Sequence, residues 1–381
     1  MKKRVRAVLA AVLTLLMCMS LLAGCGNSGN QNTTPTEENK ETKAAEEVKE
    51  NSGDEALRVL LLVPGTLGDK SFFDSANAGM DMIKEHYGAE TKVVEMGTDT
   101  TKFSATLDDV CNEGWDVIIT GGVNIAEPLQ EAAAEYPDQK FILYDESVDF
   151  SDGANANIYC ITYKSYEGAY LAGVLAASQT ETGILGFAGG FDIPLINDWL
   201  VGYISGAQAV RSDIKVSAGY MSSFTDAAKG KEIGLALYNG GADVVLQAAG
   251  GAGLGVLDAA KETGKHAIGT DSDQSELFSS DEAKANAIYA SIMKRVDVSL
   301  DKAIEKYIAG DLAFGSSEIY GIAEGCIEIT DNAWYQANVS QEVRDAVEQA
   351  KQDIIDGKIV VATAFDMTDD EVAALKESVQ P

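Results

Sequence analysis

The residues best suited to chemistry in this chain come directly after stretches that are apolar enough to be buried strands. Asp145 closes the run KFILYD, Asp271 closes HAIGTD, and Phe224 follows shortly after IKVSAGYM. Carboxylates accept hydrogen bonds from hydroxyl or ring N–H groups, and an aromatic ring stacks on a flat partner. This combination predicts a site for a flat, polyhydroxylated ligand rather than for an anion.

A second group of candidates lies in GTLGDKSFFD, after the first apolar run. Asp69 and Ser71 stand where a helix is expected to begin, so each can either cap that helix or contact a ligand. Phe72 and Phe73 are adjacent, and adjacent helical residues do not share one face, so at least one of them faces solvent or ligand rather than the core. All four are therefore candidate ligand-binding residues.

Residues 250–255 contain four glycines, which invites comparison with nucleotide-binding loops. A G-x-G-x-x-G fingerprint begun at Gly251 would need glycine in place of Val256, and one begun at Gly253 would need it in place of Asp258. No Gly-Lys-Ser/Thr follows, so the P-loop pattern fails as well. The loop remains suited to close backbone approach, in which N–H groups meet a hydroxyl or a ring oxygen.

Catalytic and metal-binding patterns are weak. The two histidines, His86 and His266, have no accompanying serine or cysteine arrangement typical of a triad. The pair Asp271 and Asp273 carries little weight among 60 acidic residues, and no CxxC pair indicates zinc. We expect no enzyme activity, no metal and no cofactor.

The N-terminus has the pattern of a secretory signal, with four basic residues before an apolar run that ends in LAGC. This ending resembles the bacterial lipobox, so residues 1–24 are predicted to be a lipoprotein signal peptide and Cys25 the lipidation site. Ordinary cleavage near Ala23 is the alternative. Residues 25–56 are too polar to bury a core and predict a disordered acidic tether. The folded part would then be anchored at the extracytoplasmic face of the cell membrane.

Composition excludes one class of partner. The 381 residues carry a formal net charge of -31, and removal of residues 1–24 leaves 25 basic against 60 acidic side chains. Nucleic-acid binding relies on Lys and Arg to neutralise phosphates, so we expect no such partner. The spacing of Cys111, Cys160 and Cys326 marks no disulfide framework; it leaves their pairing open and favours buried thiols.

From Leu57 onward, short β-rich runs alternate with amphipathic helical stretches, a pattern typical of parallel βαβ units. The runs predict about ten strands, too many for one small doubly wound sheet, so two α/β lobes are expected. Ligands of such sheets bind beyond the carboxyl ends of the strands, where the candidates above are placed.

Four strings resemble the basic membrane protein family of bacterial lipoproteins over residues 57–308: GDKSFFDSANAGM, GFAGGFDIPLINDWLVGYISGA, the stretch 224–275, and SIMKRVD. The resemblance implies a type I periplasmic-binding-protein fold, with two Rossmann-like lobes joined by a three-crossover hinge. Approximate lobe boundaries follow from it. The N-terminal lobe would comprise residues 57–164 and 286–315, and the C-terminal lobe residues 165–285 and 316–381.

The resemblance also implies a site. In the family's nucleoside receptors a base lies between two phenylalanines, which match Phe72 and Phe224, and the acid that contacts the purine matches Asp145. The ribose-binding glycine, aspartate and lysine match Gly250, Asp271 and Lys294.

One position departs from the family pattern. Phe73 stands where the nucleoside receptors carry an asparagine, which replaces a hydrogen-bonding amide with apolar surface. Another nucleoside, a free base or a flavin-like molecule is therefore an alternative to a purine nucleoside.

The function implied is that of a lipid-anchored, monomeric substrate-binding protein that delivers a nucleoside-like ligand to an ABC permease. Two other classes stay open at this point: a surface nucleoside-processing enzyme, and a surface signalling or adhesion protein.

Overall fold

The computed structural model describes residues 56–151 and 153–381. The predicted signal peptide, the predicted lipidation site Cys25 and the tether up to residue 55 lie outside this part of the chain. Within the described residues, no helix has the length and apolar character needed to span a bilayer.

The first sheet has six strands in the order β11-β5-β4-β3-β1-β2, and every neighbouring pair is parallel. Its central strands are almost fully buried, which explains their continuous runs of Val, Ile and Leu. Its strands and accompanying helices are β1 (Arg58–Val63), α1 (Phe72–Tyr87), β2 (Glu90–Glu95), α2 (Phe103–Cys111), β3 (Val117–Gly121), α3 (Ala126–Glu135), β4 (Lys140–Tyr144), β5 (Ile158–Tyr163), α10 (Val296–Ala309) and β11 (Ser316–Tyr320).

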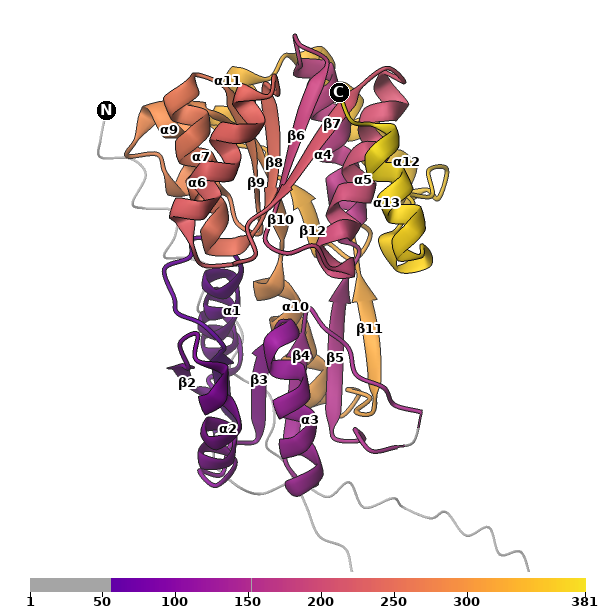
Figure 1. Cartoon of the computed structure of the whole chain (residues 1–381). Coiled ribbons are helices and arrows are strands. Elements are labelled where there is room, and N and C mark those ends of the chain that lie inside the picture. The colour runs from indigo at the N-terminus through magenta and orange to yellow at the C-terminus, as the bar shows by residue number, and fades with distance from the viewer. Residues whose placement is uncertain (1–55, 152) are drawn as a thin grey trace, which may run out of the picture. The chain divides into compact units, whose positions relative to one another are not determined.

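The second sheet has the order β12-β10-β9-β8-β6-β7 and is parallel except for the antiparallel edge strand β12. Figure 1 shows α6 and α7 on one side of this sheet and α4 and α5 on the other. Its elements are α4 (Ser165–Gln179), β6 (Ile184–Gly189), α5 (Pro194–Val210), β7 (Lys215–Tyr220), α6 (Ala227–Asn239), β8 (Val244–Ala248), α7 (Gly250–Thr263), β9 (His266–Thr270), α8 (Gln274–Leu277), α9 (Glu282–Asn286), β10 (Ile288–Lys294), β12 (Ile327–Ile329), α11 (Ala333–Asn338), α12 (Gln341–Ile355) and α13 (Asp369–Ser378).

Three segments connect the two lobes, as expected from the resemblance. They lie between β5 and α4, between β10 and α10, and between β11 and β12. The Lys164 N–H donates to the Tyr320 carbonyl at 2.8 Å, and the Arg295 N–H donates to the Cys326 carbonyl at 2.8 Å. The third connection is therefore hydrogen-bonded to both of the others, and the predicted fold of two α/β lobes with three crossovers is confirmed.

The sheet order differs from the approximate lobe boundaries. Residues 286–315 were expected in the first lobe, but β10 pairs with β9 in the second sheet, and only the α10 part of that range packs against α1. Residues 316–381 were expected in the second lobe, but β11 pairs with β5 in the first sheet. The chain changes lobes at the end of a strand in each case, and hydropathy does not mark that point.

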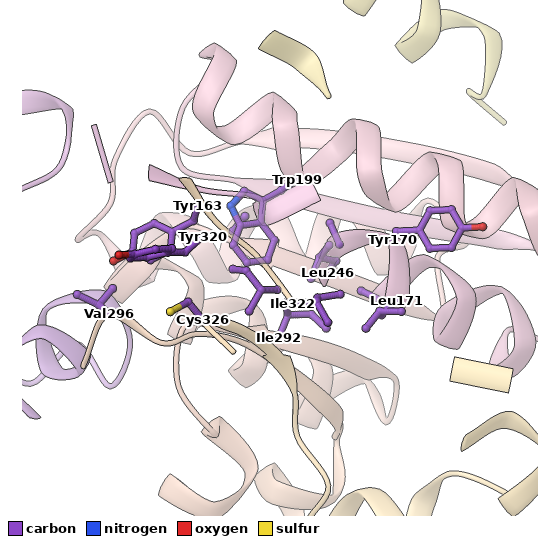
Figure 2. Close-up of a cluster of buried hydrophobic side chains, with 14 of the residues drawn as sticks. Tyr163, Tyr170, Leu171, Trp199, Leu246, Ile292, Val296, Tyr320, Ile322 and Cys326 are labelled. Carbon is purple, nitrogen blue, oxygen red and sulfur yellow. The ribbon is translucent and has the colours of Figure 1, made fainter. Parts of the chain in front are cut away.

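The core of the second lobe includes an unusually close helix pair, α4 and α5. Helix α4 is buried around almost its whole circumference. A Cβ at Gly206 would overlap the carbonyl oxygen of Tyr170, and one at Gly202 would overlap that of Tyr166. Figure 2 shows the buried side chains that extend this core to the crossovers, with Trp199 and Ile322 among them.

Cys111, Cys160 and Cys326 are all free thiols, and Cys160 and Cys326 are buried. This confirms the reading of buried thiols for two of the three and shows no pairing among them.

Gly206→Ala is expected to lower the free energy of unfolding by about 2 kcal/mol, because the added methyl group forces α4 and α5 apart. Urea denaturation of the mature chain measures the change. Gly240→Ala is the matched control, since Gly240 is exposed at the end of α6 with right-handed backbone angles. Equal stability of the two variants would contradict the close-packing argument.

Candidate functional site

A cavity of about 300 Å3 lies at the carboxyl ends of both sheets. Its walls come mainly from residues at or after the strand ends of both lobes, as the rule for open α/β sheets requires, together with residues of helices such as α1 and α5. Eight of the nine residues predicted to bind ligand line this cavity: Asp69, Phe72, Phe73, Asp145, Phe224, Gly250, Asp271 and Lys294.

Aromatic rings from both lobes line the cavity. Phe72 and Phe73 come from the first turn of α1, and their ring centroids are 5.2 Å apart. Phe224 comes from the loop before α6, where its ring packs against Gly190 and lies 4.9 Å from the ring of Phe191. Aromatic surface from both lobes therefore faces the cavity and suits a flat ring system.

Lys294 is the cation among the described residues that line the cavity, and it is 4% exposed. Its Nζ donates to Oδ2 of Asp145, which belongs to the other lobe, at 2.7 Å, and it lies 3.7 Å from Oδ1 of Asp271. Burial by itself lowers the pKa of Lys294, but the two carboxylates outweigh it and raise that pKa above its usual value. The ammonium group therefore keeps its charge inside the protein.

The two carboxylates occupy equivalent places in the two lobes. Asp145 directly follows β4 with φ of 61°, and Asp271 directly follows β9 with φ of 67°. Each donates its backbone N–H to the neighbouring strand, at 2.7 Å to Ile161 and 2.8 Å to Ile292. Aspartate tolerates this left-handed conformation better than most residues. The same turn thus places one carboxylate from each lobe at the cavity.

Asp145 has an unused acceptor. Its Oδ1 is buried and has no hydrogen-bond partner among the described residues. Burial raises the pKa of Asp145 to about 6, although Lys294 opposes that rise. A buried acceptor without a donor costs free energy. This oxygen is therefore well placed to accept a hydrogen bond from a ligand.

Asp69 both caps a helix and lines the cavity. Its carboxylate accepts the N–H groups of Ser71, Phe73 and Asp74 at 3.0, 2.9 and 3.1 Å. Burial nevertheless raises the pKa of Asp69 to about 6. The two alternatives that the sequence left open for Asp69 are thus compatible.

Ser71 does not line the cavity, unlike the other eight candidates. Its side chain is fully buried, and its Oγ donates to Oδ2 of Asp271 in the opposite lobe at 2.5 Å. Ser71 therefore holds a cavity carboxylate in place. Its position does not support a direct contact with a ligand.

The glycine-rich loop is the first turn of α7, which begins at Gly250. Gly250 has φ of 54°, a left-handed conformation that glycine adopts without steric cost. At Gly255 a Cβ would overlap the carbonyl oxygen of Ala227, so this glycine allows α6 and α7 to pack closely. Two of the four glycines are thus explained by backbone conformation and helix packing.

Asn124, Thr225 and Trp199 also line the cavity but were not among the residues expected from the sequence. Asn124 and Thr225 follow β3 and β7, so the strand-end rule applied to every strand would have found them. Trp199 lies inside α5 and is 2% exposed, which from sequence is indistinguishable from a core residue.

The histidines lie outside the site. His86 contacts Asp301 on the surface, and His266 stacks on Tyr289 at 3.9 Å; neither lines the cavity. Within residues 56–151 and 153–381, no group of three or more His, Cys, Asp or Glu side chains is arranged to hold a metal ion.

Two α/β lobes, joined by three crossovers around a cavity at facing strand ends, define a substrate-binding protein of the periplasmic-binding-protein type. The chain belongs to the family described as ABC transporter substrate-binding protein PnrA-like, whose model matches residues 56–363. This confirms the family resemblance.

Relatives and solved structures agree with this assignment. The chain is 33% identical over 381 residues to "ABC transporter nucleoside-binding protein BmpA" of Lactococcus lactis subsp. cremoris, covering 95% of this chain and 99% of that one. It is 30% identical to "Basic membrane protein A" of Borreliella burgdorferi, covering 82% and 90%. An ABC transporter solute-binding protein from Aeropyrum pernix K1 superposes with a TM-score of 0.71 at 25% identity, covering 85% and 97%.

Lys294→Met is expected to destabilise the protein by about 3 kcal/mol near pH 8, because two buried carboxylates then lack their cation. The folded-state pKa of Asp145 is already above its ordinary 3.8 and would rise further. A carboxyl group with a raised folded-state pKa costs stability progressively as pH rises from its unfolded-state pKa to its folded-state pKa, so the penalty should be smaller near pH 5 than near pH 8.

Urea denaturation at the two pH values measures this. Lys284→Met is the control, because Lys284 is also buried but pairs with the half-exposed Asp258. A Lys294→Met penalty that is the same at both pH values would contradict the charge argument.

Proposed function

We propose that this chain is a lipid-anchored substrate-binding protein that carries a nucleoside-like ligand, with a purine nucleoside favoured, to an ABC permease. The observation that carries the proposal is that one cavity combines Phe72 of the first lobe, Phe224 of the second and the unpaired buried Oδ1 of Asp145. A base stacks on such rings while an N–H group on its edge donates to the carboxylate. The relative from Lactococcus lactis, described as nucleoside-binding, supports this reading.

The sugar would lie toward the second lobe. Asp271 accepts hydrogen bonds from ribose hydroxyl groups, Lys294 donates to them, and the left-handed turn at Gly250 lets backbone approach closely. Three carboxylates and one lysine make the described cavity lining acidic. This charge disfavours a ligand that carries phosphate, so a nucleoside is a better candidate than a nucleotide.

Phe73 determines which other ligands are candidates. Its ring packs over Gly65 and lines the cavity, so it presents apolar surface where the nucleoside receptors have an amide. A free base or a flavin-like molecule is the second candidate for this reason. Mass spectrometry of small molecules that copurify with the protein distinguishes these ligands.

In this proposal the two lobes close on the ligand. Binding shifts the population toward the closed state, since the ligand contacts both lobes only in that state, and the permease recognises the closed form.

Phe72→Ala, Phe224→Ala and Asp271→Ala are each expected to weaken binding of a purine nucleoside such as inosine by more than about tenfold, or 1.4 kcal/mol. Each change removes a stacking face or a hydroxyl acceptor. Isothermal titration calorimetry provides the measurement, and Phe365→Ala is the control, since Phe365 is 60% exposed and lies outside the cavity. Wild-type affinity in all three variants would contradict the assignment of the ligand-binding site.

A surface nucleoside-processing enzyme is the rival function from another class. Incubation of the purified protein with inosine, followed by chromatography of the products, separates the two: we expect no turnover. A surface protein without a role in import would leave nucleoside uptake unchanged when its gene is deleted, whereas a substrate-binding protein would not.

Cys25→Ser is expected to move the protein from the membrane fraction to the medium or periplasm, because the diacylglycerol attachment site is lost. Detergent phase partitioning and intact mass of the wild-type chain measure the lipid. Retention of the variant in the membrane fraction would argue against lipidation at this cysteine.

A further inference from the structure

A series of hydrogen-bonded, buried amide groups runs through the second lobe and ends on the first lobe. We call this series the amide chain. The Ala249 N–H donates to Oε1 of Gln247 at 3.2 Å, and Nε2 of Gln247 donates to Oε1 of Gln274 at 3.0 Å. Nε2 of Gln274 then donates to the carbonyl of Lys70 in the first lobe at 3.2 Å. Both glutamine side chains are completely buried. The chain thus starts at the residue before α7 and ends in the opposite lobe.

The direction of this chain is fixed by backbone groups. Oε1 of Gln247 faces the N–H of Ala249, and Oε1 of Gln274 also accepts the N–H of Thr270 at 3.3 Å. A backbone N–H can only donate and the Lys70 carbonyl can only accept. Neither amide can therefore be reversed without leaving donors opposite donors.

Two glycines provide the space for these side chains. A Cβ at Gly253, in the first turns of α7, would overlap the amide of Gln247. A Cβ at Gly269, in β9, would overlap Oε1 of Gln274. This accounts for a third glycine of the glycine-rich loop, which neither a phosphate-binding fingerprint nor helix packing explains.

The amide chain ends in the first lobe at Lys70, which lies with Ser71 in a turn that packs against the second lobe. Ser71 Oγ donates to Asp271 at 2.5 Å, Ser272 Oγ donates to the carbonyl of Ser71 at 3.2 Å, and Nζ of Lys70 lies 5.5 Å from the ring centroid of Phe278. The contact from Gln274 to Lys70 differs from these because it continues to the residue that precedes Gly250.

We propose that Gln274 is a positioning residue that makes the first turn of α7 depend on lobe closure. When the lobes close, Lys70 accepts from Gln274, which completes the hydrogen bonds of the buried amides that hold Ala249 and Gly250 at the cavity. When they open, Gln274 loses this acceptor and the turn is less constrained. The preference for nucleosides over free bases is thereby set in the closed state, since the turn faces the sugar side of the proposed ligand. This last step rests on the proposed function; the coupling of the amide chain to closure does not.

The test uses Gln274→Met, which keeps the shape of the side chain and removes its hydrogen bonds, and Gln247→Met as a second variant. Ser272→Ala is the matched control, because it removes an inter-lobe hydrogen bond that is not part of the chain. Lobe closure is followed by energy transfer between dyes at Glu131→Cys in α3 and Glu232→Cys in α6, both exposed, in a Cys111→Ser background. Affinity is measured for inosine and for hypoxanthine.

We expect Gln274→Met and Gln247→Met to weaken inosine binding roughly tenfold and hypoxanthine binding by much less, within the usual range of coupling between sites. Ser272→Ala should affect both ligands alike. Equal losses for the two ligands, or a lower melting temperature with unchanged affinities, would mean that the glutamines only fill the core.

The closure readout separates this inference from the proposed function. In the unliganded protein, Gln274→Met should shift energy transfer toward the open state more than Ser272→Ala does, whatever the natural ligand is. If the wild-type protein binds neither inosine nor hypoxanthine, the proposed function fails, and the unliganded comparison still decides the coupling. An unchanged open fraction in Gln274→Met would overturn the proposed coupling between the amide chain and lobe closure.

Discussion

Lys294 is buried between two carboxylates that come from different lobes, and the arrangement of the site depends on this cluster. A buried ammonium group is tolerated only when it is paired and hydrogen-bonded. Asp145 supplies the direct ion pair and Asp271 the second negative charge at 3.7 Å. Because the pair crosses between lobes, the electrostatics of the cavity depend on how the two lobes face each other.

The cluster in turn depends on equivalent turns in the two sheets. Asp145 and Asp271 each directly follow a buried strand in a left-handed conformation, and each is hydrogen-bonded through its backbone N–H to the next strand. The two sheets therefore hold the carboxylates, and the three crossovers join the lobes that carry them. Two further side chains form hydrogen bonds between the lobes: Ser71 of the first lobe to Asp271, and Gln274 of the second lobe to the carbonyl of Lys70. Hydrogen bonds as well as the ion pair of Lys294 therefore join the two lobes around the cavity.

The position of strand ends made much of the site predictable. Carboxylates and aromatic residues in the loops and helix starts that follow apolar strands are candidates for a site, because in parallel sheets these segments converge at one edge. Phe72, Phe224, Asp145 and Asp271 were found in this way and all line the cavity. Gly250 and Lys294 were reached through the family resemblance, because a glycine or a lysine in its local pattern looks like an ordinary turn or a solvated charge.

Other features could not be read along the chain. Ser71 and Asp69 stand two residues apart at the same helix start, yet one contacts Asp271 and the other lines the cavity, a difference set by the direction in which the first turn of α1 meets the opposite lobe. Trp199 is a core residue by burial, and it lines the cavity because of the way α5 packs in the second lobe. The lobe that receives β10 or β11 is decided by strand pairing between residues more than a hundred positions apart in the case of β11.

The sequence by itself determined the alternation of strands and helices, the two-lobe class and the residues at the strand ends, because hydrophobic periodicity and turn chemistry are local properties. The tertiary structure alone decided which lobe each late strand joins, which of the cavity residues face a ligand and which hold a neighbour, and how Gln247 and Gln274 connect the glycine-rich turn to the opposite lobe. These depend on contacts between distant segments, and their energies arise only when the two sheets are placed face to face.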